Sequence, residues 1–165
     1  MPKKRQTPFK VGDLIVYPAH GVGRISAIQA EILYGEEIEL ICIQIENEGL
    51  TLKVPKHRVA MSGMRPLADP ETSLKALEMM RKRPRGKTGT WSRRAQEYEK
   101  KINSGDLILA AEVVRDLRAK SGSYSERMIY ERALGRVSRE IGPVLGQDPD
   151  LIRSEVEAFQ ERAAA

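Results

Sequence analysis

EIELICIQIENEGLTLKVP, residues Glu37–Pro55, contains two runs of strand-forming residues with a turn between them. The first run, Glu37–Glu46, is rich in β-branched Ile, and Asn47–Gly49 are typical turn residues. The second run, Leu50–Pro55, alternates between apolar and polar residues, as a half-buried strand does. Its apolar face consists of Leu50, Leu52 and Val54, and its polar face of Thr51 and Lys53.

Upstream of this hairpin, two further strands are indicated. Gly12–Pro18 is a short β-branched run bounded by Gly and Pro, and Gly23–Ile32 precedes a turn at Tyr34–Glu36. Four or five short strands with tight turns predict a small antiparallel barrel of the SH3-like or Tudor-like type. Because the inner faces of such a small barrel form its own core, we expect function on its outer surface or loops.

Downstream of the barrel, the apolar period becomes helical. Asp69-Pro70 and Asp148-Pro149 each combine an N-cap with Pro at the first helical position, and Ser123 with Glu126 has the form of a capping box. The fold class is therefore α+β, with the barrel followed by an all-helical domain of about five helices. The expected helices run from Asp69, from Thr90 to Ser104, from Asp106 to about Lys120, from Ser123 toward Ile141 before Gly142-Pro143, and from Asp148 onward.

We divide the chain into four parts on these patterns. Residues 1–8 are a flexible basic arm, 9–62 the barrel, 63–69 a linker and 70–165 the helical domain. At 165 residues, two small domains are within the size that folds independently.

Composition excludes several classes of protein. No run approaches the roughly 20 apolar residues that a membrane span requires. The basic start lacks the apolar stretch of a signal peptide, and the single Cys42 cannot form an internal disulfide. These features predict a cytoplasmic protein with no membrane partner, and nothing in them requires more than a monomer.

No catalytic site is apparent. His20 and His57 lack neighbours at metal-ligand spacing, so we expect no metal, and no phosphate-binding loop is present. Gly21-Val22-Gly23 lacks the third glycine of a dinucleotide fingerprint, which favours turn or bulge residues. Cys42 lies in an apolar run and is more often a core residue than a nucleophile. We therefore expect no enzyme, no cofactor and no small-molecule substrate.

Positive charge is concentrated in one place. Residues 79–96, the basic segment, contain seven Lys or Arg and no Asp or Glu, although the chain carries a net charge of only +5. Such a patch attracts polyanions, and nucleic acid is the commonest polyanion in a cytoplasm. The alternative is a solvated charged loop.

The only tryptophan, Trp91, lies in the basic segment. At helical spacing it shares a stripe with Ala95, Tyr98 and Ile102, which favours a core residue. Arg93 and Arg94, however, occupy a first helical turn, where the helix dipole disfavours cations. Helix N-terminal amides with two arginines suit phosphate, and an exposed Trp ring can press against base steps. Nothing resembles a base-reading helix, so we expect contact with DNA backbone and shape.

Several segments together resemble one family. FKVGDLIVYPAHGVG (Phe9–Gly23), LTLKVP (Leu50–Pro55), TWSRR (Thr90–Arg94), SGD (Ser104–Asp106) and AEVVRDL (Ala111–Leu117) resemble the CarD/CdnL family of bacterial transcription regulators. The similarity spans about Phe9 to Ile141. The first segment alone would also suit the polymerase-interacting domain of transcription–repair coupling factor.

The resemblance implies a Tudor-like domain that binds the β subunit of RNA polymerase. It also implies a helical domain that contacts promoter DNA near the −10 element, at the upstream edge of the bubble, and stabilises the open complex without sequence-specific contact. Trp91 would be the wedge at the minor groove. The resemblance and the charge pattern give a DNA-binding set of Trp91, Arg93, Arg94, Arg85 and Lys87, and a polymerase-binding set of Lys53 and Pro55.

Two departures from the family pattern are present. Glu31 lies where a second basic docking residue is expected, and residues 25–52 hold six acidic and no basic side chains. Polymerase contact would then depend more on backbone pairing at a sheet edge. The chain ends in ERAAA without a basic, proline-rich tail, as in the short stand-alone form.

Two other function classes stay open at this point. One is an autonomous nucleic-acid-binding or nucleoid-associated protein, and the other is an interaction scaffold whose basic loop is only solvated surface. The acidic hairpin favours a protein partner for the barrel.

Overall fold

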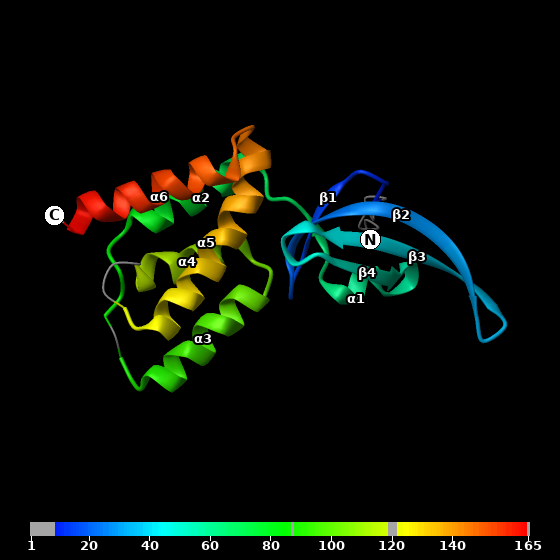
Figure 1. The fold of residues 1–165 in the computed structure, drawn as a ribbon, viewed down its shortest axis with the longest axis horizontal. Helices are drawn as coiled ribbons and strands as arrows, with labels where there is room; N and C mark the ends of the chain where they lie inside the picture. Colours follow the sequence, from blue (N-terminus) through cyan, green and yellow to red (C-terminus); the bar gives the residue numbers. More distant parts are fainter. Residues whose placement is uncertain (1–8, 87, 119–121, 165) are drawn as a thin grey trace, which may run out of the picture.

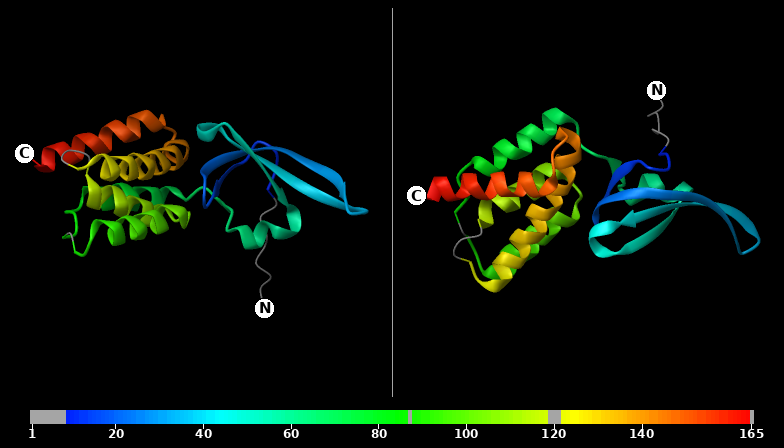
Figure 2. Two further views of the ribbon diagram at one scale, coloured as in Figure 1. Left: turned by 60° about the horizontal axis from the view of Figure 1, so that its bottom comes forward. Right: turned by 45° about the horizontal axis from the view of Figure 1, so that its top comes forward.

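The computed structural model describes residues 9–86, 88–118 and 122–164. These residues form two lobes, a curved β-sheet and a group of helices, which lie side by side in every view (Figures 1 and 2). The predicted fold class, a small antiparallel β domain followed by helices, is confirmed. The basic arm predicted for residues 1–8 lies outside the described residues.

The sheet lobe contains five antiparallel strands in the order β4-β3-β2-β1-β5. The strands are β1 Leu14–Tyr17, β2 Gly21–Leu33, β3 Glu36–Ile45, β4 Leu50–Pro55 and β5 Arg65–Pro66. β2 and β3 form a long hairpin that projects away from the helices in Figure 1. Its turn is made by Tyr34 and Gly35, both with positive φ (52° and 79°), the conformation that matches the twist of a two-residue hairpin.

One face of the sheet forms the core of this lobe. Ile15, Ile25 and Ile43 are fully buried there, and Leu50, Leu52 and Val54 pack with them, as the alternation in β4 predicts. Gly23 lies on the same face, where a Cβ would come within 2.6 Å of Ile45 Cδ1. A side chain at this position would displace the isoleucines. Gly23 is therefore a packing requirement in the middle of a strand, not a ligand-binding glycine.

After β4, the chain passes through two short 3₁₀ and α-helical turns, η2 Lys56–Arg58 and α1 Val59–Ser62. A similar 3₁₀ turn, η1 Glu46–Glu48, joins β3 to β4. β5 then pairs with β1, opposite Ile15 and Val16. The sheet thus extends into the range 63–69 that we predicted as a linker, because a two-residue strand leaves no periodic pattern. The division into domains stays a prediction.

The helical lobe contains α2 Pro70–Arg81, α3 Trp91–Asn103, α4 Leu107–Leu117, α5 Tyr124–Leu145 and α6 Pro149–Ala164. Side-chain caps begin the first four of these helices, as predicted: Asp69, Thr90, Asp106 and Ser123 each accept a hydrogen bond from the backbone N–H three residues on. Each such cap satisfies one amide that the helix itself leaves unpaired.

The predicted end of α5 before Gly142-Pro143 is wrong. The helix continues through Pro143 to Leu145, and Gly146 ends it in the left-handed conformation with φ 67°. Pro143 lies in the last turn, where its missing N–H costs a single helical hydrogen bond. Gly142 O still accepts from the N–H of Gln147 at 2.8 Å, so the helix terminus stays closed.

A mostly aliphatic core joins the five helices. Met80, Val113, Leu134, Ile141 and Ile152 are fully buried in it. Tyr130 is also buried, and its hydroxyl donates to Gln160 Oε1 at 2.6 Å, while burial raises the pKa of the phenol to about 12. Within the described part of the chain, no helix is long and apolar enough to cross a membrane.

Candidate functional site

The loop 82–90 between α2 and α3 carries the centre of the basic segment. Its backbone is pinned to the end of α4: the N–H of Arg85 donates to Asp116 Oδ1 at 2.9 Å, and Arg118 Nη2 donates to the carbonyl of Lys82 at 2.6 Å. The side chains of Lys82, Arg83 and Arg85 are exposed. The loop thus presents several cations to solvent on a fixed backbone. Lys87, predicted to bind DNA, lies outside the described residues.

Asp116 has a second role beside holding the loop. Its carboxylate accepts from Arg115 Nε at 2.8 Å and Arg115 Nη2 at 3.2 Å. These hydrogen bonds raise the pKa of the Arg115 guanidinium. The carboxylate that holds the Arg85 backbone is therefore also paired with the guanidinium of a buried arginine.

Trp91 is the first residue of α3 and is partly buried. It packs against the helical core beside Ala95 and Tyr98, with the Trp91 and Tyr98 ring centroids 6.4 Å apart. The core interpretation and the surface interpretation of Trp91 are therefore each partly right. One part of the ring is fixed by packing and the remainder is accessible at the basic end of the helical lobe.

Arg93 and Arg94 differ in their surroundings. Arg93 is exposed, whereas the Arg94 side chain is only 14% exposed, with its guanidinium carbon 5.3 Å from the Trp91 ring centroid. Arg94 Nη2 lies 3.8 Å from Glu126 Oε1 at the start of α5. Within the described structure, Nε and Nη2 of Arg94 are buried without a hydrogen-bond partner. Arg94 thus contacts the tryptophan rather than open solvent.

The predicted polymerase-binding residues lie on the outer face of β4. Lys53 and Pro55 are two residues apart on this strand, so both point away from the sheet core, which Val54 faces. β4 is at the end of the strand order and pairs with β3 alone among the described strands. One edge of its backbone is therefore available for pairing with another chain.

Lys53 is not a free cation. Its Nζ lies 3.2 Å from Glu31 Oε1 across the sheet, with the two side chains 52% and 37% exposed. Lys56 and Glu39 form a similar pair at 2.9 Å. Both ion pairs are exposed, so each contributes little to stability. Their effect is to balance the charges of Lys53 and Lys56 on this surface, while the exposed Glu36 and Glu37 keep the tip of the β2–β3 hairpin acidic.

Two contacts in these sites could not be predicted from the sequence. The contact between Arg94 and Glu126 joins residues 32 positions apart, and the Lys53–Glu31 pair joins residues 22 positions apart. In the sequence, Glu31 was identified only as an acidic residue at a position where a basic docking residue was expected. The register between β2, β3 and β4 was needed to bring it to Lys53. The described residues contain no group of three or more His, Cys, Asp or Glu arranged to hold a metal ion.

The two surfaces lie on different lobes, β4 in the sheet lobe and the start of α3 at the end of the helical lobe away from the sheet (Figure 1). The fold is a β-sheet lobe joined to a helical lobe, without a metal-ligand cluster among the described residues. The chain belongs to the CarD-like family: residues 75–157 match the model for the CarD C-terminal domain, and residues 9–68 match the CarD-like/TRCF RID domain. This is a family of transcription regulators that interact with RNA polymerase, and not a family of enzymes.

Two relatives illustrate the range of similarity. YdeB of Bacillus subtilis (strain 168), named as a candidate transcription factor, is 27% identical over 150 residues, which are 88% of this chain and 98% of that protein. The solution structure of the 72-residue N-terminal domain of Myxococcus xanthus CarD is 33% identical. The match between the two covers 40% of this chain and 89% of that domain, with a TM-score of 0.32.

Proposed function

We propose that the protein binds the β subunit of RNA polymerase through β4 and stabilises the promoter open complex through Trp91 and the basic segment. The observation that carries this proposal is a partly buried Trp91 at a helix start, next in sequence to a loop in which Lys82, Arg83 and Arg85 are exposed and the backbone of Arg85 is hydrogen-bonded to Asp116. DNA-binding proteins of several folds combine an apolar wedge with cations on the phosphates. A protein with this role works in the bacterial cytoplasm.

Each residue of the basic segment has a distinct task in this proposal. Arg85 and Arg93, whose side chains are exposed, contact phosphates at the upstream edge of the bubble, near the −10 element. Trp91 presses its accessible edge against the bases. Arg94 supports the ring from behind, since its guanidinium lies over Trp91 and beside Glu126. Lys87 completes the DNA-binding set as a prediction from the sequence alone.

The polymerase contact uses Lys53, Pro55 and the free edge of β4. Among the described strands β4 has one paired side, so its other side can accept an extended segment from the β subunit as an additional strand. Lys53 and Pro55 then contribute side-chain contacts on the outer face. Because Glu31 already pairs with Lys53, shape and backbone pairing supply more of this contact than net charge does.

An open-complex lifetime assay tests the proposal. Polymerase holoenzyme forms open complexes on a promoter with or without the protein, and heparin then traps the dissociated enzyme. We expect wild-type protein to extend the lifetime and Trp91→Ala to lose most of the extension. Unchanged lifetimes with the wild-type protein, together with nanomolar binding of the protein alone to duplex DNA, would instead support an autonomous nucleic-acid-binding protein.

A further inference from the structure

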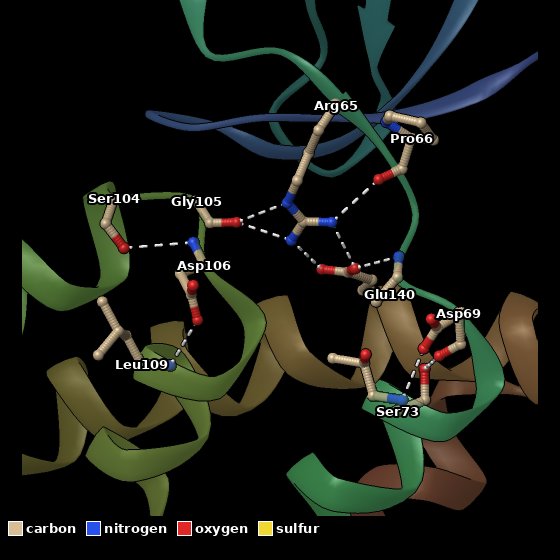
Figure 3. Close-up of polar contacts among 11 residues, drawn as sticks. Arg65, Pro66, Asp69, Ser73, Ser104, Gly105, Asp106, Leu109 and Glu140 are labelled. Atoms are coloured by element: carbon tan, nitrogen blue, oxygen red, sulfur yellow. Dashed lines mark hydrogen bonds and ion pairs between the residues drawn. The ribbon is translucent and has the colours of Figure 1, made fainter. Parts of the chain in front are cut away.

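Two arginines cross between the lobes in opposite directions. Arg65, on β5 of the sheet lobe, extends into the helical lobe, and Arg136, on α5 of the helical lobe, extends to the β1–β2 loop. Figure 3 shows the first of these contacts. The proposed DNA and polymerase contacts involve neither residue, and their arrangement requires a separate explanation.

Arg65 is held by acceptors from two other segments and by the carbonyl of its own neighbour Pro66, which accepts from Nη1 at 3.0 Å. Its Nε and Nη2 donate to the carbonyl of Gly105, after α3, at 3.0 and 2.6 Å. Its Nη1 and Nη2 each donate to the carboxylate of Glu140, on α5, at 2.8 Å (Figure 3). Glu140 is only 3% exposed and also accepts from the N–H of Ala68 at 2.8 Å. The two-pronged geometry fixes the guanidinium plane as well as its position.

Arg136 forms the reciprocal contact. Its Nη1 donates to the carbonyl of Pro18 at 2.7 Å and to that of Ile102 at 3.0 Å, and its Nη2 donates to Ala19 at 2.5 Å. Burial at this contact lowers the pKa of the guanidinium to about 10. One side chain thus joins the β1–β2 loop to the middle of α5 and to the C-terminal end of α3.

The backbones also meet closely between these arginines. A Cβ on Gly105 would lie 2.9 Å from the Cα of Pro18, and a Cβ on Gly63 would lie 3.0 Å from Pro18 Cγ. Pro18 therefore fits between two glycines, one before α2 and one after α3. The cavity that remains between the lobes here is about 20 Å³, close to the space of one water molecule. This close packing is local to the contact, because a larger cavity of about 280 Å³ lies elsewhere between the lobes, lined by Val22 and Gln44 of the sheet lobe and by Arg139 of the helical lobe.

We infer that Arg65, Glu140, Arg136 and the Pro18–Gly105 contact form a lock that fixes the orientation of β4 relative to Trp91. A buried ion pair adds little net stability compared with an apolar pair, and its best-supported use is to fix one geometry. Arg65, Glu140 and Arg136 are therefore positioning residues. They contact neither of the proposed partners.

The length of α3 makes this orientation important. Gly105, at the lock, and Trp91 are at opposite ends of the helix, which at 13 residues is about 20 Å long. A rotation of about 10° at the lock would move the tryptophan by roughly 3.5 Å at that length. Such a displacement is enough to remove a stacked ring from its base. The functional part of this inference rests on the proposed function, whereas the lock itself does not.

A glycine pair provides the matched test. Gly105→Ala places a methyl against Pro18, at φ +77°, while Gly146→Ala meets nothing within 4 Å at a similar φ of +67°. The two variants share the backbone strain, and only the first opens the lock. Arg65→Lys is the milder second variant, because it keeps the charge and loses the two-pronged contact with Glu140. It covers the case in which Gly105→Ala does not fold.

Two measurements are made on each full-length variant. Spin labels at Ala60→Cys and Glu155→Cys, both exposed, report the distance between lobes in a Cys42→Ser background. Open-complex lifetime and retention by the polymerase β subunit report function. We expect a broadened distance distribution and a lifetime extension reduced about fivefold or more for Gly105→Ala and Arg65→Lys, the range of typical coupling between two sites. Retention by the β subunit should match wild type, and Gly146→Ala should behave as wild type in both measurements.

Two results would overturn the inference. The first is a narrow, wild-type distance distribution in folded Gly105→Ala and Arg65→Lys proteins, which would mean that no lock exists. The second is a broadened distribution with a wild-type lifetime, which would mean that orientation is not required. If the wild-type protein itself does not extend the lifetime, the proposed function fails. The distance measurement still decides the lock.

Discussion

The outer face of β4 and the basic segment contrast in how their charges are paired. In the sheet lobe, Lys53 on β4 pairs with Glu31 on β2, and Lys56 in η2 pairs with Glu39 on β3. In the helical lobe, the exposed cations of residues 82–93 are accompanied by no acid in their own stretch of sequence. A surface with balanced charge and a free strand edge suits a protein. A surface with unbalanced positive charge suits a polyanion.

The contrast shows that the net charge of the whole chain describes neither surface, because the two surfaces differ in how their charges are paired. Contact through β4 should depend on geometry and respond weakly to salt, because its ion pairs form within the protein. Contact through the basic segment should depend on ion release and respond strongly to salt. Each prediction below tests one side of this difference.

The largest expected effect is that of salt on DNA binding by the free protein. A few phosphates within reach, at ~0.9 per contact, give a log–log slope on the order of −2 to −5. A fourfold rise in salt should then weaken binding by roughly 16- to 1000-fold. Fluorescence anisotropy with labelled duplexes of unrelated sequence measures this, and affinity should not depend on the sequence. A slope near zero would show that the basic segment is ordinary solvated surface.

Trp91→Ala should have the next largest effect. Loss of a stacking ring, worth ~1–3 kcal/mol, should shorten the open-complex lifetime about tenfold. Because the ring is only partly buried, thermal unfolding should show a stability loss of about 2 kcal/mol, below the ~3–5 kcal/mol for a fully buried aromatic. Tyr98→Ala is the control, since it removes a neighbouring ring and leaves Trp91 in place. A stability loss of ~3–5 kcal/mol together with a wild-type open-complex lifetime would show that Trp91 is a core residue only.

Lys53→Glu tests the balanced face. This change replaces the Lys53–Glu31 ion pair by two adjacent carboxylates on the docking face. We expect retention of the polymerase β subunit to fall about tenfold, equivalent to ~1.4 kcal/mol, because charge reversal at a contact disfavours docking. The fold should be unaffected, since exposed pairs contribute little. The charge-swapped double variant Glu31→Lys/Lys53→Glu restores the ion pair but not the position of the cation. Full recovery of binding in this double variant would contradict direct contact by Lys53.

The smallest expected effect separates the two arginines. Arg93→Met should weaken DNA binding about threefold, as loss of one phosphate contact does, and leave the emission of the single tryptophan unchanged. Arg94→Met removes the cation over the Trp91 ring, so the emission maximum should change while the salt slope stays at the wild-type value. Identical spectra for the two variants would show that Arg94 does not support the ring.

Local signals in the sequence predicted most of the fold. β4 has the bounds that its alternation predicts, and Asp69, Thr90, Asp106 and Ser123 cap the helices that they were expected to begin. The errors arise where residues distant in the sequence determine whether a helix or strand forms and where it ends. α5 passes Pro143 because the helix end is closed by Gly142, Gly146 and Gln147, and β5 exists because β1 is beside it.

The candidate site was only partly accessible from the sequence. The stripe through Trp91, Ala95 and Tyr98 predicted a helix face packed on the core, and it is present. The burial of Arg94 could not be predicted, because it depends on Glu126 at the start of another helix. The same reason applies to Arg65 and Glu140, which are 75 positions apart and carry no motif.

The contact of Pro18 with Gly105 also has a consequence for chimeric proteins. Pro18 belongs to the sheet half of the chain, and Gly105 to the helical half. A hybrid that takes each half from a different relative inherits one side of this contact without the other. Such a hybrid needs a small residue after α3, and an Arg and a Glu at the positions of Arg65 and Glu140, for its halves to sit together as they do here. The two halves of this chain are therefore exchangeable only as a matched set.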